Sequence, residues 1–177
     1  MSELNIFLGP PGAGKGTQAI KIAEEFGLAH ISTGDMLRNH ISNRTELGKI
    51  AKSVMDEGHL VSDDLVIKML VERLGSDDCK NGAILDGFPR TLPQAKSLED
   101  IKNEFPVDKV FVFEVDEKEL VQRILSRGET SGRSDDTVES IKVRFEIYTQ
   151  DTEPLIDFCN KQDKVLKINA VGEIDLI

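Results

Sequence analysis

Short apolar runs alternate with segments of helical periodicity along almost the whole chain. The first run, residues 4–8, leads into a glycine-rich turn. Apolar residues then recur three or four positions apart up to residue 26, as they do on one face of a helix. Four further apolar runs predict buried strands of the same kind. The five predicted strands are residues 4–8, 29–32, 83–85, 109–115 and 165–168.

The segments between these strands carry further helix signals. Apolar stripes bounded by turn and capping residues mark where each helix begins and ends. A long last helix is predicted from Asp136, with Glu139 three residues on as in a capping box. Residues 76–81 and 128–135 are predicted to be connecting loops. The other predicted helices cover residues 35–41, 46–57, 62–74, 93–105 and 117–127.

This order of elements predicts one α/β domain spanning residues 1–177. Strands that alternate with helices form right-handed crossovers, which give a parallel sheet with helices on both faces. Ligands of such sheets bind at the carboxyl ends of the strands. Two segments are additions to a simple alternation of strands and helices: a helical insertion at 32–61 and a short loop at 127–137. We expect both to act as moving covers.

The turn after the first strand has the pattern of a phosphate-binding loop. Residues 9–18, Gly-Pro-Pro-Gly-Ala-Gly-Lys-Gly-Thr-Gln, fit G-x4-G-K-[ST], except that Gly16 stands at the Ser/Thr position and Thr17 follows it. Glycines let backbone N–H groups point inward, the helix N-terminus adds partial positive charge, and Lys15 adds a full charge. The alternative is an ordinary Gly/Pro turn followed by a lysine. The strand before the loop and the amphipathic helix after it favour phosphate binding.

Composition and charge narrow the class of ligand. The net charge of −10 disfavours broad binding to nucleic acid or anionic membranes, although local cations can still hold the phosphates of a nucleotide. A hydrophobic content of 39% supports a core, and no apolar run is long enough to span a membrane. The first strand follows Met1 almost directly, so we expect no signal peptide and a cytoplasmic protein.

Cysteine and histidine positions indicate no metal chemistry. Cys79 and Cys159 lie far apart without a C-x-x-C spacing, which we interpret as two buried thiols in a reducing compartment. The three histidines, His30, His40 and His59, are isolated from one another and from any nucleophile. We therefore predict no zinc site and no catalytic histidine.

The arginines provide a second signal, because six of them lie next to turns or in tight groups. Guanidinium is a planar fork of donors that matches phosphate, and a cluster of fixed cations stabilises a transferring phosphoryl group. For any one arginine, a surface ion pair with the abundant acids is the alternative. The six are Arg38, Arg90, Arg123, Arg127, Arg133 and Arg144.

Four segments together resemble the adenylate kinase family of nucleoside monophosphate kinases. They occur in order and at matching spacing across nearly the whole chain, which is far more specific than the phosphate loop alone. The resemblance implies reversible transfer of the γ-phosphoryl group of ATP to AMP, giving two ADP, with Mg²⁺ as cofactor. The segments are residues 9–18, Ser32-Thr-Gly-Asp-Met-Leu-Arg38, Leu85-Asp-Gly-Phe-Pro-Arg-Thr91 and Arg127-Gly-Glu-Thr-Ser-Gly-Arg-Ser-Asp-Asp136.

The resemblance implies roles for the matching residues on the ATP side. The phosphate loop would wrap the ATP phosphates, Arg123 and Arg127 would meet ATP, and Gly172 would approach its adenine. Asp86 would orient Mg²⁺ through water, with Thr17 as a second candidate. The implied ATP-binding residues are Gly12, Ala13, Gly14, Lys15, Gly16, Thr17, Arg123, Arg127 and Gly172.

The resemblance assigns a second set of residues to AMP. The first insertion would hold the nucleotide, Arg90 its phosphate and Gln94 its adenine, while Arg133 and Arg144 would grip the transferring group. The implied AMP-binding residues are Thr33, Arg38, His59, Leu60, Val61, Gly87, Phe88, Pro89, Arg90, Gln94, Arg133 and Arg144. The implied catalytic residues are Lys15, Asp86, Arg90, Arg127, Arg133 and Arg144. The carboxylates of Asp135 and Asp136 would help to close the lid, a role that competes with helix capping by Asp136.

Two features refine the resemblance. Only five residues separate Arg127 from Arg133, which is typical of the short-lid form and implies no zinc. Family members usually finish with one more helix, whereas this sequence stops at Ile177. By default, we expect a monomer whose partners are ATP, AMP and ADP.

Two alternatives remain at this point. A UMP/CMP kinase shares the fold and the 131–136 segment, but the resemblance associates Thr33 and Gln94 with AMP, because a glutamine amide can match the donor amine and acceptor nitrogen of adenine. A non-catalytic nucleotide-binding switch would retain the phosphate loop, yet it has no need for four of these arginines, namely Arg38, Arg90, Arg133 and Arg144.

Overall fold

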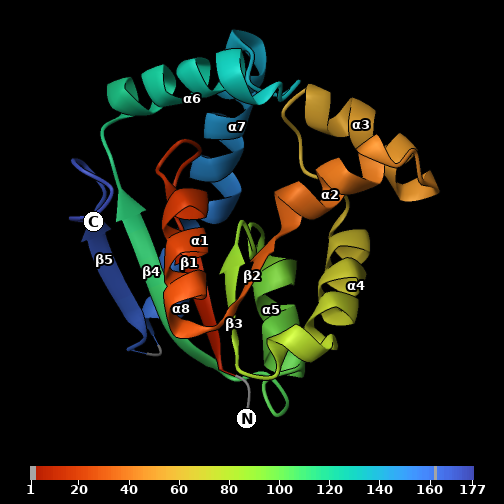
Figure 1. Ribbon diagram of the computed structural model, residues 1–177, viewed down its shortest axis with the longest axis vertical. Coiled ribbons are helices and arrows are strands. Elements are labelled where there is room, and N and C mark those ends of the chain that lie inside the picture. Colours follow the sequence, from red (N-terminus) through yellow and green to blue (C-terminus); the bar gives the residue numbers. More distant parts are fainter. Residues whose placement is uncertain (1–2, 162) are drawn as a thin grey trace.

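The computed structural model describes residues 3–161 and 163–177, and its centre is a five-stranded parallel sheet (Figure 1). The strand order is β2-β3-β1-β4-β5, and every pairing is parallel. The strands are β1 Leu4–Leu8, β2 Ala29–Ser32, β3 Ala83–Asp86, β4 Val107–Glu114 and β5 Val165–Asn169. All five predicted strands are confirmed to within two residues at either end.

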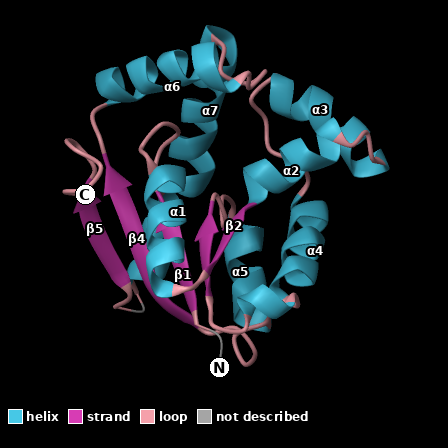
Figure 2. Cartoon of the chain, viewed as in Figure 1, coloured by secondary structure: helices cyan, strands magenta, loops and turns pink. Residues whose placement is uncertain are grey.

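Side-chain alternation along the strands builds two hydrophobic cores, one on each face of the sheet. Ile6 and Leu8 pack with residues of α4 (Asp63–Leu74) and α5 (Leu92–Asp100). Phe7, between them, packs instead with α1 (Lys15–Phe26). Successive strand residues point to opposite faces, so both faces are covered, as predicted (Figure 2).

The insertion after β2 is helical, as predicted, and consists of two packed helices. These are α2 (Thr33–Ser42) and α3 (Glu46–Asp56), each with a side-chain cap at its first turn. The Ser32 hydroxyl accepts from the Asp35 N–H, and the Thr45 hydroxyl accepts from the Gly48 N–H. Gly48 is buried where α3 meets the end of α2. The contact requires glycine, because a Cβ at this position would lie 2.0 Å from the His40 carbonyl oxygen.

Two helix ends differ from the prediction by four residues or more. The helix predicted at 93–105 ends at Asp100, because Ile101 and Phe105 turn into the core ahead of Pro106. A residue that precedes proline disfavours helical conformation. The helix α6 (Glu117–Ser131) continues four residues past its predicted end, so half of the predicted 128–135 loop is helical. It stops at Gly132, which has φ of 65°.

The predicted capping box at Asp136 is wrong. Helix α7 (Val138–Ile147) begins one residue later, and Thr137 is its cap: the Thr137 hydroxyl accepts from the Ser140 N–H. The Asp136 carboxylate is instead fully buried among arginines. The long helix is also interrupted by a π-helical turn, Tyr148–Thr152, before α8 (Pro154–Asn160). Pro154 lacks the N–H that a regular helix would use there.

Two sequence expectations concern thiols and membranes. Cys79 is buried and Cys159 is half-buried against the core, so the prediction of two buried thiols is right for the first only. Within the described residues, none of the helices combines the length and apolarity needed to cross a bilayer.

Replacing Gly48 by alanine is expected to destabilise the protein by about 2 kcal/mol or more, because the new methyl overlaps backbone atoms of α2. Chemical denaturation measures the free energy of unfolding. Gly75→Ala is the control, since its Cβ would meet nothing closer than 3.4 Å and its φ is −73°. Equal stability of the two variants would contradict the close packing of α2 on α3.

Candidate functional site

A cavity of about 660 Å³ opens at the carboxyl ends of the strands. In Figure 1 the strand arrowheads point toward α6, which crosses above them, while α2 and α3 extend to one side. The cavity is lined by the loop after β1, the insertion, the loop after β3, and residues of α6 and α7 on either side of the second cover. Every residue predicted for the site lies in its wall except Phe88, whose side chain is fully buried in the core.

The glycine-rich loop curls around the N-terminus of α1. Gly12 has φ of 82° and packs so closely on α6 that a Cβ would lie 2.8 Å from Ile124. Gly14 has φ of 89°, and a Cβ there would meet nothing within 4 Å, so a ligand can approach its backbone. The half-buried Lys15 ammonium donates to the carbonyls of Gly9 and Pro10 at 2.8 and 3.0 Å. This arrangement suits a phosphate group.

Asp86 lies at the end of β3, directly behind the loop. A Cβ on Gly16 would be 3.2 Å from the Asp86 carboxylate, so glycine keeps this carboxylate accessible from the loop. Burial acts to raise the pKa of Asp86, but the hydrogen bond from His30, 3.4 Å away, and the charge of Lys15 hold it below its usual value. Asp86 is therefore an ionised carboxylate beside the phosphate loop.

Two arginines converge on the buried carboxylate of Asp136. Arg127 binds it with both fork nitrogens, at 2.8 and 2.6 Å, and Arg144 donates to it at 3.0 Å. Burial acts to raise the pKa of Asp136, but these guanidinium groups hold it below its usual value. Arg144 also contacts the carboxylate of Asp135 at 3.4 Å. Each guanidinium keeps further donors with which to meet a ligand.

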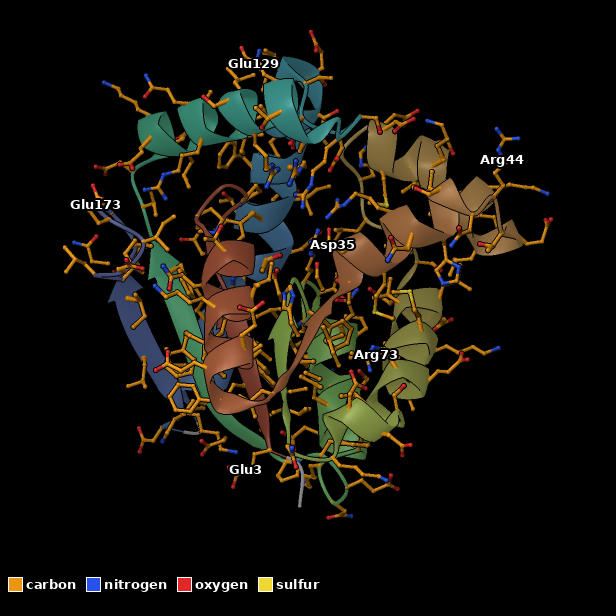
Figure 3. The ribbon with its side chains drawn as sticks, in the orientation of Figure 1. Glu3, Asp35, Arg44, Arg73, Glu129 and Glu173 are labelled. Carbon is orange, nitrogen blue, oxygen red and sulfur yellow. The ribbon has the colours of Figure 1, made fainter. Side chains whose placement is uncertain are left out.

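Asp35 lies on α2 (Figure 3) and joins the two covers across the cavity. Its carboxylate accepts from Arg38 at 2.7 Å on the same helix and from Arg133 at 3.3 Å, which follows α6. Burial acts to raise the pKa of Asp35, but these two arginines hold it below its usual value. The structure thus places Arg38 and Arg133 side by side, although 95 residues of sequence separate them from one another.

Lys15 and Arg90 also line the cavity, and their charges are repelled by those of the neighbouring arginines. Burial lowers the pKa of Lys15 to about 8, and the charges of Arg90, Arg144 and Arg127 add to this effect. Burial and the charge of Arg144 lower the pKa of Arg90 to about 10. Arg90 is held by its own loop, since its Nε donates to the Gly87 carbonyl at 2.8 Å. The site favours anions strongly.

The other half of the cavity is suited to a flat, partly apolar group. Thr33 is buried at the start of α2, and its hydroxyl donates to the Gly87 carbonyl at 2.9 Å, which leaves it as an acceptor toward the cavity. Gln94, on α5, is also buried and lines the cavity. Leu60 and Val61 provide apolar surface, and the side chain of His59 is exposed.

Arg123 and Gly172 lie at the outer edge of the phosphate-loop side. Arg123 donates to the carbonyl of Ala170 at 3.1 Å and pairs with Glu119 on α6. Gly172 is exposed, has φ of 122°, and an added Cβ would meet nothing within 4 Å. Both residues line the cavity, so the loop after β5 forms one of its walls.

Three residues outside the predicted site contact predicted site residues in the structure. Asp35 and Asp63 lie at the starts of two predicted helices, where acids are common, and Thr152 carries no signal of a site. Asp63 contacts Gln94, and Thr152 donates to the Arg90 carbonyl at 2.8 Å. The sequence offered one hint of these roles: Asp35 and Asp63 each lie at the start of a helix and close to residues predicted for the site. Among the described residues, no group of three His, Cys, Asp or Glu is arranged to hold a metal ion.

The arrangement supports charge stabilisation rather than covalent catalysis. Cations from the loop, the insertion and the second cover surround one cavity. A phosphoryl group that passes between two anionic ligands needs positioning and neutralisation of charge, and an anionic acceptor needs no general base.

Comparisons with known proteins agree with this chemistry. A family model described as adenylate kinase matches residues 7–164. Proteins named adenylate kinase from Leptospira biflexa, Parabacteroides distasonis and Stenotrophomonas maltophilia are 48%, 47% and 45% identical to the chain over 174 residues. Each comparison covers 97% of this chain and 92–94% of the relative. The chain therefore belongs to the adenylate kinase family.

Proposed function

We propose that this protein transfers the γ-phosphoryl group of Mg·ATP reversibly to AMP, giving two ADP. The observation that carries the proposal is the convergence of Lys15 and arginines from three separate segments on one cavity. Membership of the adenylate kinase family and relatives of that name support it. The attacking group is a phosphate oxygen, which is already anionic, so the chain need only position and neutralise the reactants.

The donor nucleotide would lie over the glycine-rich loop. Backbone N–H groups of residues 12–17 and the N-terminus of α1 would hold its phosphates. Lys15 would exchange its contacts with loop carbonyls for a phosphate oxygen. Arg123 and Arg127 would bind from α6, and the loop at Gly172 would cover the adenine.

The acceptor would lie between the insertion and the loop after β3. Arg38 and Arg90 would bind the AMP phosphate, with Thr33 and Gln94 next to its base, the backbone of residues 59–61 around the adenine and residues 87–89 completing the wall. Arg133 and Arg144 would neutralise charge on the group in transfer. The Asp35–Arg133 contact, which already joins the two covers, would favour exclusion of water, the competing acceptor.

A magnesium ion fits the site as a companion of ATP. Magnesium keeps several waters and uses few protein ligands in nucleotide sites. Asp86 supplies an ionised oxygen beside the phosphate loop, and Thr17 adds an exposed hydroxyl on the same wall. Asp86 would orient the metal through water, and the metal would neutralise charge on the phosphates. One chain supplies all these groups, so we propose that a monomer is active.

A coupled assay that offers AMP, CMP, UMP and dGMP with Mg·ATP tests the function. We expect AMP to be the preferred acceptor. Preference for CMP or UMP would replace the proposal with a pyrimidine nucleotide kinase. Transfer to none of the four would leave the nucleotide-binding switch as the better account.

Arg133→Lys is expected to lower kcat by at least ~tenfold, because a lysine ammonium lacks the two-pronged geometry that matches a phosphoryl group. Steady-state kinetics with AMP as acceptor measure the effect. Arg44→Lys, at an exposed turn between α2 and α3, is the control and should retain the native rate. An Arg133→Lys enzyme as fast as the control would remove Arg133 from the site.

Thr33→Ala is expected to lower the ratio of kcat/KM for AMP to that for CMP, since the variant lacks the hydroxyl acceptor beside the base. The Gly87 carbonyl keeps its bond from Arg90, so no buried group is left without a partner. The exposed Thr149→Ala serves as the control. An unaltered ratio would show that Thr33 does not read the base.

ATP binding near pH 8.5 is expected to take up about three quarters of a proton. The pKa of Lys15 is about 8 in this structure, and a bound phosphate stabilises the charged ammonium and so raises it. Affinity should therefore fall as the pH rises above about 8. Calorimetry in two buffers of different ionisation enthalpy measures the uptake. Lys15→Met should abolish it, and equal uptake in that variant would assign the proton to another group.

A further inference from the structure

A polar cluster around the buried Gln94 lies beneath the base-side half of the cavity, where α4 meets α5. The amide nitrogen of Gln94 donates to the Asp63 carboxylate at 2.9 Å, and the amide oxygen accepts from the backbone N–H of Arg90 at 2.8 Å. The Thr91 hydroxyl donates to the same Asp63 oxygen at 2.8 Å. The side chain of Gln94 is thus held at both ends of its amide.

These partners permit only one orientation of the amide. A carboxylate only accepts hydrogen bonds, and a backbone N–H only donates them. Turning the Gln94 amide over would set its oxygen against the Asp63 carboxylate and its N–H groups against the Arg90 N–H. Both contacts would be repulsive in a buried site, where an unpaired polar group costs most.

The backbone of Arg90, whose N–H donates to Gln94, is itself held in place. Its carbonyl accepts from Thr152 at 2.8 Å, and its side chain donates to the Gly87 carbonyl at 2.8 Å. Thr152 belongs to the π-helical turn, so this irregular turn fixes the backbone that fixes Gln94. The amide therefore has a rigid support on one side and Asp63 on the other.

The fixed amide keeps one N–H and one oxygen lone pair in reserve, and it lines the cavity. An adenine presents an amine donor beside a ring-nitrogen acceptor. A 6-oxopurine presents the reverse, a carbonyl acceptor beside a ring N–H. We infer that Asp63 is a positioning residue that sets the choice of base, because it locks Gln94 in the one orientation that suits adenine and rejects 6-oxopurines.

This inference rests on the proposed function for the location of the base, but it concerns a residue that touches no substrate. The alternative is a purely structural role, in which Asp63 only holds the start of α4 against α5. That role predicts a change in stability and no change in the relative use of two bases. The two roles are therefore separated by a ratio rather than by a rate.

The test compares AMP with IMP, which differs from it only at the 6-position and N1 of the base. Asp63→Asn keeps the shape of the side chain but adds an amide N–H that can donate to the oxygen of a turned Gln94 amide, so that only the Arg90 N–H still opposes the turn. We expect the ratio of kcat/KM for IMP to that for AMP to rise about tenfold over the native protein. Asp64→Asn is the matched control, since it removes the same charge from the next, exposed residue of α4.

Both substrates are measured on one preparation, so a partly folded sample does not change the ratio. Asp63→Ser, whose hydroxyl can donate and accept, should shift the ratio in the same direction. A ratio within about twofold of the native value in both Asp63 variants would overturn the inference.

The proposed function and this inference can fail separately. If the native protein transfers phosphate to AMP while the ratio stays fixed, only the inference falls. If the native protein transfers phosphate to no acceptor, the proposed function falls. The inference is then tested by calorimetry, with the ratio of the dissociation constants of AMP and IMP in place of the ratio of kcat/KM, for the native protein and for each variant.

Discussion

The crowding of positive charge around one cavity is the constraint on which the rest of the structure depends. Lys15 and Arg90 have lowered pKa values because the cavity wall removes much of the water around them and they face other cations. Such a group is stable only if anions lie within reach, since an unpaired buried charge costs several kcal/mol. The chain supplies these anions itself, from Asp35, Asp86 and Asp136, at positions that a bound nucleotide would approach.

The ion pairs between these aspartates and the arginines also hold the two covers near one another. Arg133 contacts Asp35 across the cavity, and Ser140 on α7 donates to the Asp56 carbonyl at the end of α3. Under the proposed function, phosphate oxygens would compete with Asp35 for the same guanidinium groups, so ligand binding would exchange one anion for another. Such an exchange would keep the arginines paired throughout, and movement of the covers would then cost less than the release of an unpaired charge.

The sequence predicted the sheet and most of the cavity wall because their signals are local. Apolar runs mark the strands, and few other environments need a lysine such as Lys15 in a glycine-rich turn. The partners of those cations could not be predicted, since Asp35 and Arg133 are 98 residues apart and only the fold joins them. The end of α6 was misplaced for the same reason: Gly128 is tolerated in the helix because it packs against Asp136.

Asp136 shows which effect prevails when local and long-range rules compete. An N-terminal cap contributes about 1 kcal/mol, whereas leaving the fully buried Asp136 carboxylate without its arginines would cost about 3–5 kcal/mol. The carboxylate therefore binds Arg127 and Arg144, and the neighbouring Thr137, which has no charge to pair, becomes the cap. Asp63 follows the same logic at the start of α4, where its oxygen orients the amide of Gln94. In this protein, an acid at a helix start that borders the cavity is better read as a partner of a site residue than as a cap.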